Sequence, residues 1–149
     1  MVHRAWFSHE EYKTLYTATR ANIKSQNNTR YQQLAAQLHD KVLFMANTGI
    51  RPDKANGLEY RDVEIVEDDA TGKTILEIEV RGKRGVGYCK STTGAVRPFQ
   101  RMMRRNLPAS TDRLFPVEHN RQFNRILEET GLKFDRQGNR RTLYSLRHC

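Results

Sequence analysis

The chain has 149 residues, 37% of them hydrophobic, and its 26 lysines and arginines exceed its 17 acidic residues to give a formal net charge of +9. This length suits one domain with a real hydrophobic core, and the positive charge favours a polyanionic partner, either nucleic acid or an anionic surface. No apolar run approaches the ~18 residues that cross a bilayer and the N-terminus lacks the apolar segment of a signal peptide, so we expect a cytoplasmic protein that does not enter a membrane.

The first predicted element is a helix that begins after Ser8. The Ser8 side chain can cap this helix, and Glu11 can accept a hydrogen bond from the Ser8 amide in return. Residues 25–29 have the polar composition of a turn, which ends the helix.

A second helix is predicted from about residue 31 to 47, followed by a tight turn. Gly49 suits the left-handed residue that closes a helix, and Pro52 suits the first turn of a short following segment. Arg51 therefore lies at a helix–turn–helix junction, where the backbone holds it in place. The helical period assigns four residues of this helix to the core: Leu34, Leu38, Val42 and Met45.

Two strands of a small antiparallel sheet are predicted next. Residues 62–66 and 74–80 alternate between apolar and polar side chains, and a turn at 69–72 joins them. The sequence also allows a third strand at residues 88–90. Between the second and third strands we expect a mobile basic hairpin loop, because three glycines interrupt the pattern: Gly82, Gly85 and Gly87.

The rest of the chain reads as three helices. A basic helix at 94–105 ends at Leu107 and Pro108, and another is expected at 118–130. Thr142 can cap a last helix at the end of the chain. Helices around a small antiparallel sheet define a mainly α-helical α+β domain.

Four basic residues suggest a phosphate site. The guanidinium groups of Arg51 and Arg147 can each hold two phosphate oxygens and together stabilise the charge of a pentacoordinate transition state. His148 can add a third donor or transfer a proton near neutral pH. Lys83 can protonate a departing alkoxide. Such a site needs no metal and no cofactor, and the sequence contains no C-x-x-C pair for zinc.

Each of these residues also has a simpler interpretation. Taken singly, a basic residue in a turn or on a helix is more often solvated or salt-bridged than catalytic. The helix at 94–105 illustrates this: we expect a solvated basic face, with phosphate contact as the second interpretation. Three further residues are expected to be structural, Cys89 as a small apolar side chain and His39 and His119 as surface or capping residues.

Taken together, four stretches resemble the catalytic domain of the tyrosine recombinases, the phage-integrase family. Residues 48–51, Thr-Gly-Ile-Arg, are similar to the first arginine box of the family, and residues 78–83 to its β-hairpin with a lysine. Residues 114–116, Leu-Phe-Pro, are similar to the segment before the second box. Residues 143–148, Leu-Tyr-Ser-Leu-Arg-His, are similar to the second box, usually H-x-L-R-H. The order and spacing match across nearly the whole chain.

The resemblance implies a role for each matching residue. Arg51 and Arg147 match the two phosphate-clamping arginines, and His148 matches the histidine that follows the second one. Lys83 matches the hairpin lysine, with Lys90 as the alternative. Tyr144 stands where the family most often has His or Lys, and its phenol can donate a hydrogen bond there. Six basic residues are expected to contact DNA: Arg84, Lys90, Arg97, Arg101, Arg104 and Arg105.

The sequence also departs from the family pattern. Lys54 occupies a position where the family often has an acid, which removes an expected negative partner of Arg51. The family's nucleophilic tyrosine follows the second box, whereas all six tyrosines of this chain precede Arg147. We therefore expect residues 1–149 to be one partial catalytic domain, without the N-terminal core-binding domain and the C-terminal catalytic helices.

The resemblance implies an activity on double-stranded DNA. Enzymes of the family break and rejoin DNA in site-specific recombination or integration, through a 3′-phosphotyrosyl intermediate and in a complex of several recombinase protomers. This fragment is expected to be unable to cleave DNA by itself. The alternatives are a noncatalytic DNA-binding module and an inert remnant of a mobile genetic element.

Overall fold

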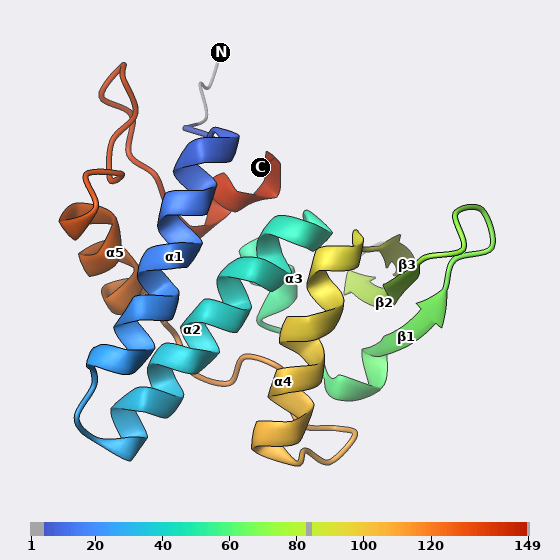
Figure 1. The fold of residues 1–149 in the computed structure, drawn as a ribbon. Coiled ribbons are helices and arrows are strands. Elements are labelled where there is room, and N and C mark those ends of the chain that lie inside the picture. Colours follow the sequence, from blue (N-terminus) through green and yellow to red (C-terminus); the bar gives the residue numbers. More distant parts are fainter. Residues whose placement is uncertain (1–4, 83–84, 149) are drawn as a thin grey trace.

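The structure is a computed structural model that describes residues 5–82 and 85–148. Three helices lie side by side in Figure 1: α1 (His9–Ser25), α2 (Thr29–Thr48) and α4 (Val96–Asn106). In the same view the sheet lies to the right of α4, and α5 lies to the left of α1. The remaining elements are α3 (Pro52–Ala55), η1 (Tyr60–Asp62), β1 (Val63–Glu67), β2 (Thr74–Gly82), β3 (Gly85–Lys90), η2 (Thr93–Ala95), α5 (Asn120–Glu129) and η3 (Leu143–His148).

Helix α1 begins with the predicted capping box. The Glu11 amide donates to Ser8 Oγ at 3.1 Å, and the Ser8 amide donates to Glu11 Oε1 at 2.9 Å. These bonds satisfy two backbone donors that the first turn of a helix leaves without partners. Leu15 and Thr19 are buried against the rest of the protein. The start of the helix is therefore confirmed.

Helix α2 passes through the middle of the domain and ends as predicted. Leu38, Val42 and Met45 are buried, as expected, whereas Leu34 is only half-buried. Gly49 has φ 69°, a left-handed conformation that costs little for glycine. The chain then enters α3 at Pro52. The predicted helix–turn–helix junction is therefore present.

The sheet is antiparallel, with strand order β1-β2-β3. Ile78 pairs with Val63 on one side and with Cys89 on the other. The expectation that Gly85 and Gly87 interrupt strand pairing was wrong, because both belong to β3. This strand is at the sheet edge and its side chains are mostly exposed, so backbone pairing suffices and glycine loses little packing.

The helices of the second half are close to their predicted positions. Helix α4 follows the short η2 and ends at Leu107, whose φ of 43° is left-handed. The predicted last helix is present as η3, and it is a 3₁₀-helix. The Ser145 amide donates to the Thr142 carbonyl at 2.9 Å, and the Tyr144 amide donates to Thr142 Oγ1 at 3.2 Å. Thr142 thus accepts at the start of the segment, as expected, and a bond over three residues produces the tighter helix.

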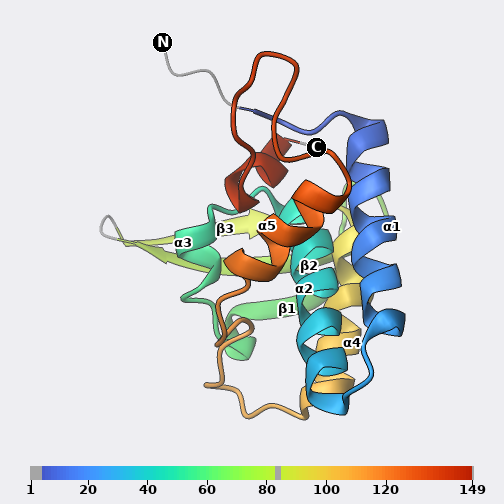
Figure 2. The ribbon, with the colours of Figure 1, turned by 90° about the vertical axis from the view of Figure 1, so that its left-hand side faces the viewer.

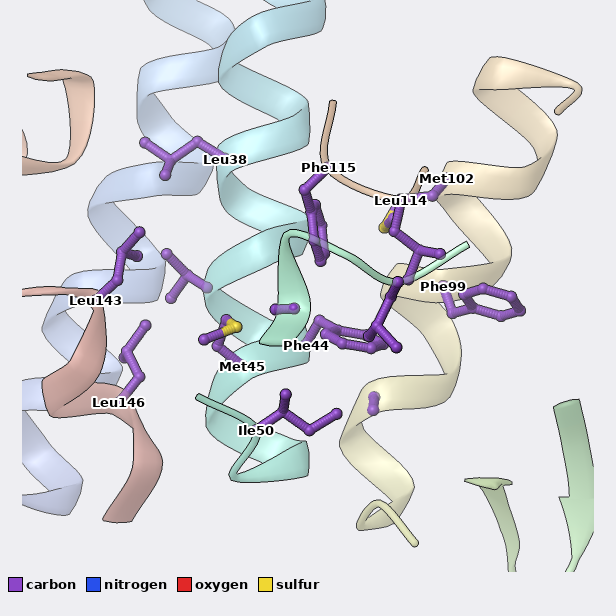
Figure 3. Close-up of a cluster of buried hydrophobic side chains, with 14 of the residues drawn as sticks. Leu38, Phe44, Met45, Ile50, Phe99, Met102, Leu114, Phe115, Leu143 and Leu146 are labelled. Carbon is purple, nitrogen blue, oxygen red and sulfur yellow. The ribbon is translucent and has the colours of Figure 1, made fainter. Parts of the chain in front are cut away.

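One hydrophobic core joins these elements around α2. Figure 3 shows Phe44 and Met45 in the middle of this core, with Leu143 and Leu146 from η3 on one side. The rings of Phe44 and Phe115 meet edge-to-face with their centroids 5.5 Å apart. Because Leu146 is fully buried, η3 is fixed on the core next to the position of Arg147.

Both histidines expected at the surface or in a cap are buried. His39 is 5% exposed, and its Nδ1 lies 2.7 Å from Thr19 Oγ1. His119 is 3% exposed and occupies the N-cap position of α5, but its side chain makes no capping bond. Burial lowers the pKa of each imidazole to about 4, helped by the guanidinium groups of Arg101 and Arg20 near His39 and by Lys41 near His119. Their surroundings come from other helices, which the local sequence does not show.

Candidate phosphate-binding site

The turn between α2 and α3 holds the first arginine of the predicted clamp. Arg51 is the N-cap residue of α3. The Cys89 thiol of β3 donates to the carbonyl of Thr48 at 3.4 Å, and Arg147 Nε donates to the carbonyl of Gly49 at 3.0 Å. Strand β3 and η3 therefore fix this turn from two sides. A Cβ on Gly49 would lie 3.6 Å from the carbonyl oxygen of Arg147, so the two segments approach closely.

The second arginine reaches the same place from η3. Arg147 Nη1 donates to Tyr144 Oη at 3.2 Å. The centre of the Arg147 guanidinium lies 5.4 Å from the centroid of the Tyr144 ring, and that of Arg51 lies 5.7 Å from it. Both distances are in the range of cation–π contacts. The structure thus brings three of the predicted site residues, Arg51, Tyr144 and Arg147, together.

Arg51 has a carboxylate partner that the sequence reasoning missed. Its Nε lies 3.5 Å from Asp53 Oδ1, so Asp53 compensates for Lys54 at the position of the family's acid. The two side chains are 54% and 63% exposed, which makes this a weak ion pair. A phosphate can therefore replace Asp53 as the partner of Arg51 at little cost. The neighbouring Asp at the start of a short helix was the available sequence signal.

The other predicted catalytic groups are placed only in part. Lys83 and Arg84 lie outside the described residues, as does the side chain of His148. Lys90 is described: its Nζ contacts Asp68 Oδ1 at 3.2 Å, at the end of β3 away from Gly85. Lys90 thus has a structural partner at the turn between β1 and β2.

The α4 arginines lie on a different side of the protein from Arg51. In Figure 2, α4 and α1 are on the right, whereas α3 and the described ends of β2 and β3 extend to the left. Arg101 and Arg105 bind the two carboxylate oxygens of Asp40, each at 2.9 Å. The expected solvated basic face is therefore wrong for these two, because Asp40 is buried and draws them inward. Their contact with DNA stays a prediction, as it does for Arg104 and for Arg97, both exposed.

A buried lysine near the clamp was not predicted. Lys41 is 2% exposed, and its Nζ donates to Asn56 Oδ1 at 3.3 Å and lies 5.3 Å from the centroid of the Phe115 ring. Burial lowers the pKa of its ammonium, although the nearby Glu118 carboxylate acts in the opposite direction. Lys41 lines a pocket of about 320 Å³ that shares Pro52 and Tyr144 with the surroundings of the clamp. Nothing in the helical pattern of α2 distinguishes it from a surface lysine.

The Lys41→Met variant should be more stable than the wild type by about 1 kcal/mol near neutral pH, because methionine fills the space without a buried charge. Since the folded state lowers the pKa of Lys41, the unfolded state binds more protons, and the wild type gains stability as pH rises toward the ordinary lysine value. The difference between the two proteins should therefore shrink at alkaline pH. Urea unfolding at several pH values measures the difference in stability between Lys41→Met and the wild type, and Lys13→Met, at an exposed position, is the control. A loss of stability in Lys41→Met would contradict this.

Within residues 5–82 and 85–148, no group of three or more His, Cys, Asp or Glu side chains is arranged to hold a metal ion. In the same described part of the chain, every helix is too short or too polar to cross a membrane.

The helices and the three-stranded antiparallel sheet have the arrangement of a tyrosine-recombinase catalytic domain fold. Among solved structures, the chain is similar to the XerH site-specific recombinase bound to its difH substrate, at 18% identity and a TM-score of 0.67. It is similar to the XerA recombinase at 18% identity and a TM-score of 0.66. The Tn1549 transposon integrase in complex with transposon right end DNA is 14% identical, with a TM-score of 0.59.

These likenesses cover 97 to 99% of this chain but only 40 to 52% of the solved proteins. No protein-family model matches the sequence, and neither does any curated protein. At identities of 14 to 18% the likeness is one of fold. The predicted mainly helical α+β fold of the tyrosine-recombinase catalytic domain is thereby confirmed.

Proposed function

We propose that this chain is part of a tyrosine recombinase and binds double-stranded DNA, with one backbone phosphate held by Arg51 and Arg147 beside Tyr144. One observation carries the proposal. Two guanidinium groups from distant parts of the sequence lie within 5.7 Å of one tyrosine ring, and the Arg51 side chain is 54% exposed. Paired guanidinium groups at an accessible position are suited to a phosphodiester, whose oxygens each fork can bind in pairs.

The chemistry that this site supports is phosphoryl transfer. The two arginines stabilise the extra negative charge when a phenol oxygen attacks the phosphorus, and Tyr144 Oη donates to a nonbridging oxygen. The attack forms a 3′-phosphotyrosyl bond and breaks the bond to the 5′ oxygen, which leaves as a hydroxyl. Lys83 protonates that oxygen and His148 assists at the phosphate.

The attacking tyrosine is not among the six tyrosines of this sequence, so the fragment binds DNA but does not cleave it alone. A full-length protein would act with other recombinase protomers in a synaptic complex.

The Arg51→Gln variant should bind a short DNA duplex about tenfold more weakly than the wild type at moderate salt, because it loses one phosphate contact. The slope of log affinity against log salt should fall by about one. Fluorescence anisotropy over a salt series measures both quantities. Arg113→Gln is the control: Arg113 is exposed, and its replacement removes the same charge away from the clamp.

Two results of this experiment would point elsewhere. If Arg51→Gln and Arg113→Gln weaken binding equally, the chain is a noncatalytic DNA-binding module that uses its charge without a clamp. If the wild type does not bind DNA at all, the chain is an inert remnant and the proposal is wrong.

A nicked duplex that traps covalent intermediates tests the second part of the proposal. Incubated with the purified 149-residue chain, it should give no protein–DNA adduct that survives detergent. An adduct that the wild type forms and Tyr144→Phe does not form would show that Tyr144 attacks the phosphate. That result would overturn the proposed role of Tyr144 as a hydrogen-bond donor.

A further inference from the structure

A second group of arginines surrounds a hollow on the layer formed by α1, α2 and α4. The hollow has a volume of about 390 Å³, and both α1 and α4 contribute arginines to it: Arg20 from α1, and Arg97 and Arg101 from α4. Its lining also includes His39 and Leu43 from α2. Because α1 and α4 both pack on α2, this hollow is a groove along α2 with basic side chains on both walls. We call it the α2 groove.

The α2 groove carries positive charge that the protein does not neutralise. No acid lines the groove within the described residues, and Asp40, whose side chain is 1% exposed, binds both Arg101 and Arg105. Within the described residues, Arg97 makes no hydrogen bond or ion pair, and Arg20 only lies over the Tyr16 ring at 5.8 Å.

Two features give the groove a defined shape and charge. The bonds to Asp40 hold Arg101 Nε at 2.9 Å from that carboxylate, so one wall is fixed. His39 is neutral near pH 7, because burial and the guanidinium groups of Arg101 and Arg20 lower its pKa to about 4. The groove therefore presents the guanidinium groups of Arg20 and Arg97, which have no carboxylate partner in the described residues, beside an uncharged His39. Phosphate groups of a polyanion are the ligands that such donors bind best.

The α2 groove and the clamp face in different directions. In Figure 2 the helices α1 and α4 that form the groove lie on the right, and α3, which begins after Arg51, lies on the left of α2. A straight duplex contacts one face of a domain of this size. Nucleic acid bound in the groove is therefore a different segment from the one at the clamp.

We propose that the α2 groove is a second binding site for the sugar–phosphate backbone of DNA, so that one chain holds two duplex segments on opposite sides. Arg20 and Arg97 contact phosphates from the two walls, and Arg101, which Asp40 holds in place on the α4 wall, lies beside Arg97. Only one part of this inference rests on the proposed function, namely that the ligand is DNA. The groove itself predicts a phosphate site whether or not the clamp is used.

Inorganic pyrophosphate tests the site itself. In nuclear magnetic resonance spectra of the ¹⁵N-labelled chain, it should cause saturable shifts of the Nε–H signals of Arg20 and Arg97. The Arg20→Gln/Arg97→Gln variant should bind pyrophosphate about tenfold more weakly than the wild type. The control, Lys13→Gln/Arg30→Gln, loses the same charge from exposed positions on α1 and α2 outside the groove, and should bind as the wild type does. Equal weakening in both double variants would overturn the inference.

Bridging of two duplexes tests the DNA ligand. Duplexes labelled separately with donor and acceptor dyes should show energy transfer on addition of the wild-type chain, and Arg20→Gln/Arg97→Gln should reduce it about tenfold. Affinity for a single duplex should fall by less than about threefold, since the clamp remains. If Arg20→Gln/Arg97→Gln bridges as well as the wild type, the groove inference fails and the clamp proposal stands. If Arg51→Gln weakens single-duplex binding and Arg20→Gln/Arg97→Gln does not, the clamp and the α2 groove are separate sites, as we infer.

Discussion

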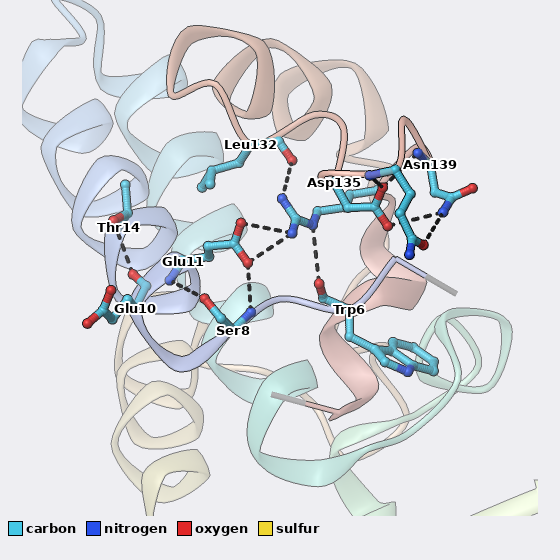
Figure 4. A network of polar contacts seen from close by, with 10 residues as sticks. Trp6, Ser8, Glu10, Glu11, Thr14, Leu132, Asp135 and Asn139 are labelled. Carbon is cyan, nitrogen blue, oxygen red and sulfur yellow. Dashed lines mark hydrogen bonds and ion pairs between the residues drawn. The ribbon is translucent and has the colours of Figure 1, made fainter. Parts of the chain in front are cut away.

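The Arg141→Met variant is expected to lose about 3 kcal/mol of stability, because it removes a buried guanidinium from a partly buried ion pair and leaves several acceptors without donors. Arg141 is 3% exposed. Its Nη2 binds both oxygens of Glu11, at 2.9 and 2.8 Å, and its other nitrogens donate to the carbonyls of Leu132 at 3.1 Å and Trp6 at 3.3 Å. Figure 4 shows this network, which joins the N-terminal segment, α1 and the loop after α5.

The effect should extend to the phosphate clamp, because Arg141 immediately precedes the segment that carries Tyr144 and Arg147. Burial opposes ionisation of Glu11, but its bonds from Ser8 and the Arg141 guanidinium outweigh this and lower the pKa of its carboxyl. Methionine removes the contribution of Arg141 and leaves the Glu11 carboxylate with the Ser8 amide as its donor.

Urea unfolding followed by circular dichroism measures the loss, and Arg140→Met is the matched control. Arg140 is the exposed neighbour of Arg141, so its replacement should change the free energy of unfolding by less than about 0.5 kcal/mol. Equal unfolding midpoints for Arg141→Met and Arg140→Met would show that the network does not stabilise the fold.

The second large effect is a loss of stability in mild acid. His39 and His119 have a pKa of about 4 in the folded protein, against an ordinary value of 6.5. Between these values the unfolded state binds more protons than the folded state, so stability falls as pH decreases from about 6.5 to about 4. The loss reaches up to about 3 kcal/mol for each histidine, because one pKa unit corresponds to about 1.4 kcal/mol.

Carboxylates do not cause the loss of stability between about pH 6.5 and the ordinary carboxyl pKa. Folding lowers the pKa of Glu11 and Asp135, so their contribution is present above the ordinary carboxyl value and is lost only below it. Unfolding midpoints in urea at several pH values between about 7 and about 5 separate the two effects. His119→Gln should reduce the slope of stability against pH, whereas exposed His9→Gln should leave it unchanged. If the stability of the wild type did not change between these pH values, both histidines would have their ordinary pKa in the folded protein.

The elements that the sequence predicts best are those determined by neighbouring residues. The Ser8 capping box, the left-handed Gly49 and the start of α3 at Pro52 each depend on backbone bonds or torsions within a few positions. Strand β3 was predicted too short, because its pairing with β2 comes from the sheet and tolerates the glycines of an edge strand. The last helix was predicted without its type, because nothing in its composition separates an α-helix from the 3₁₀-helix that forms.

The buried polar groups were missed for a different reason. Asp40, Lys41 and His39 follow one another on α2 with the composition of an exposed helical turn, yet all are at most 5% exposed. Their partners come from α1, α4, the end of α3 and the segment before α5, which lie beside this part of α2 only in the folded protein.

The candidate site shows the same division. The resemblance to the arginine boxes predicted that Arg51 and Arg147 belong to one site, and the structure places both beside Tyr144. It did not predict that Asp53 partners Arg51, or that Arg147 binds the carbonyl of Gly49. The Arg147 contact depends on how closely η3 approaches the turn after α2, which requires the packing of Leu146 in the core. The Asp53 contact is local to the start of α3.

A double-mutant cycle of DNA affinity tests the central claim most directly, that Arg51 and Arg147 hold the same phosphate. Duplex affinity is measured for the wild type, Arg51→Gln, Arg147→Gln and the double variant, with circular dichroism to verify that each is folded. We predict a loss of about tenfold for each single variant and little further loss in the double variant, a coupling of about 1 kcal/mol. Losses that simply multiply, or single variants that bind DNA as tightly as the wild type, would contradict a shared phosphate.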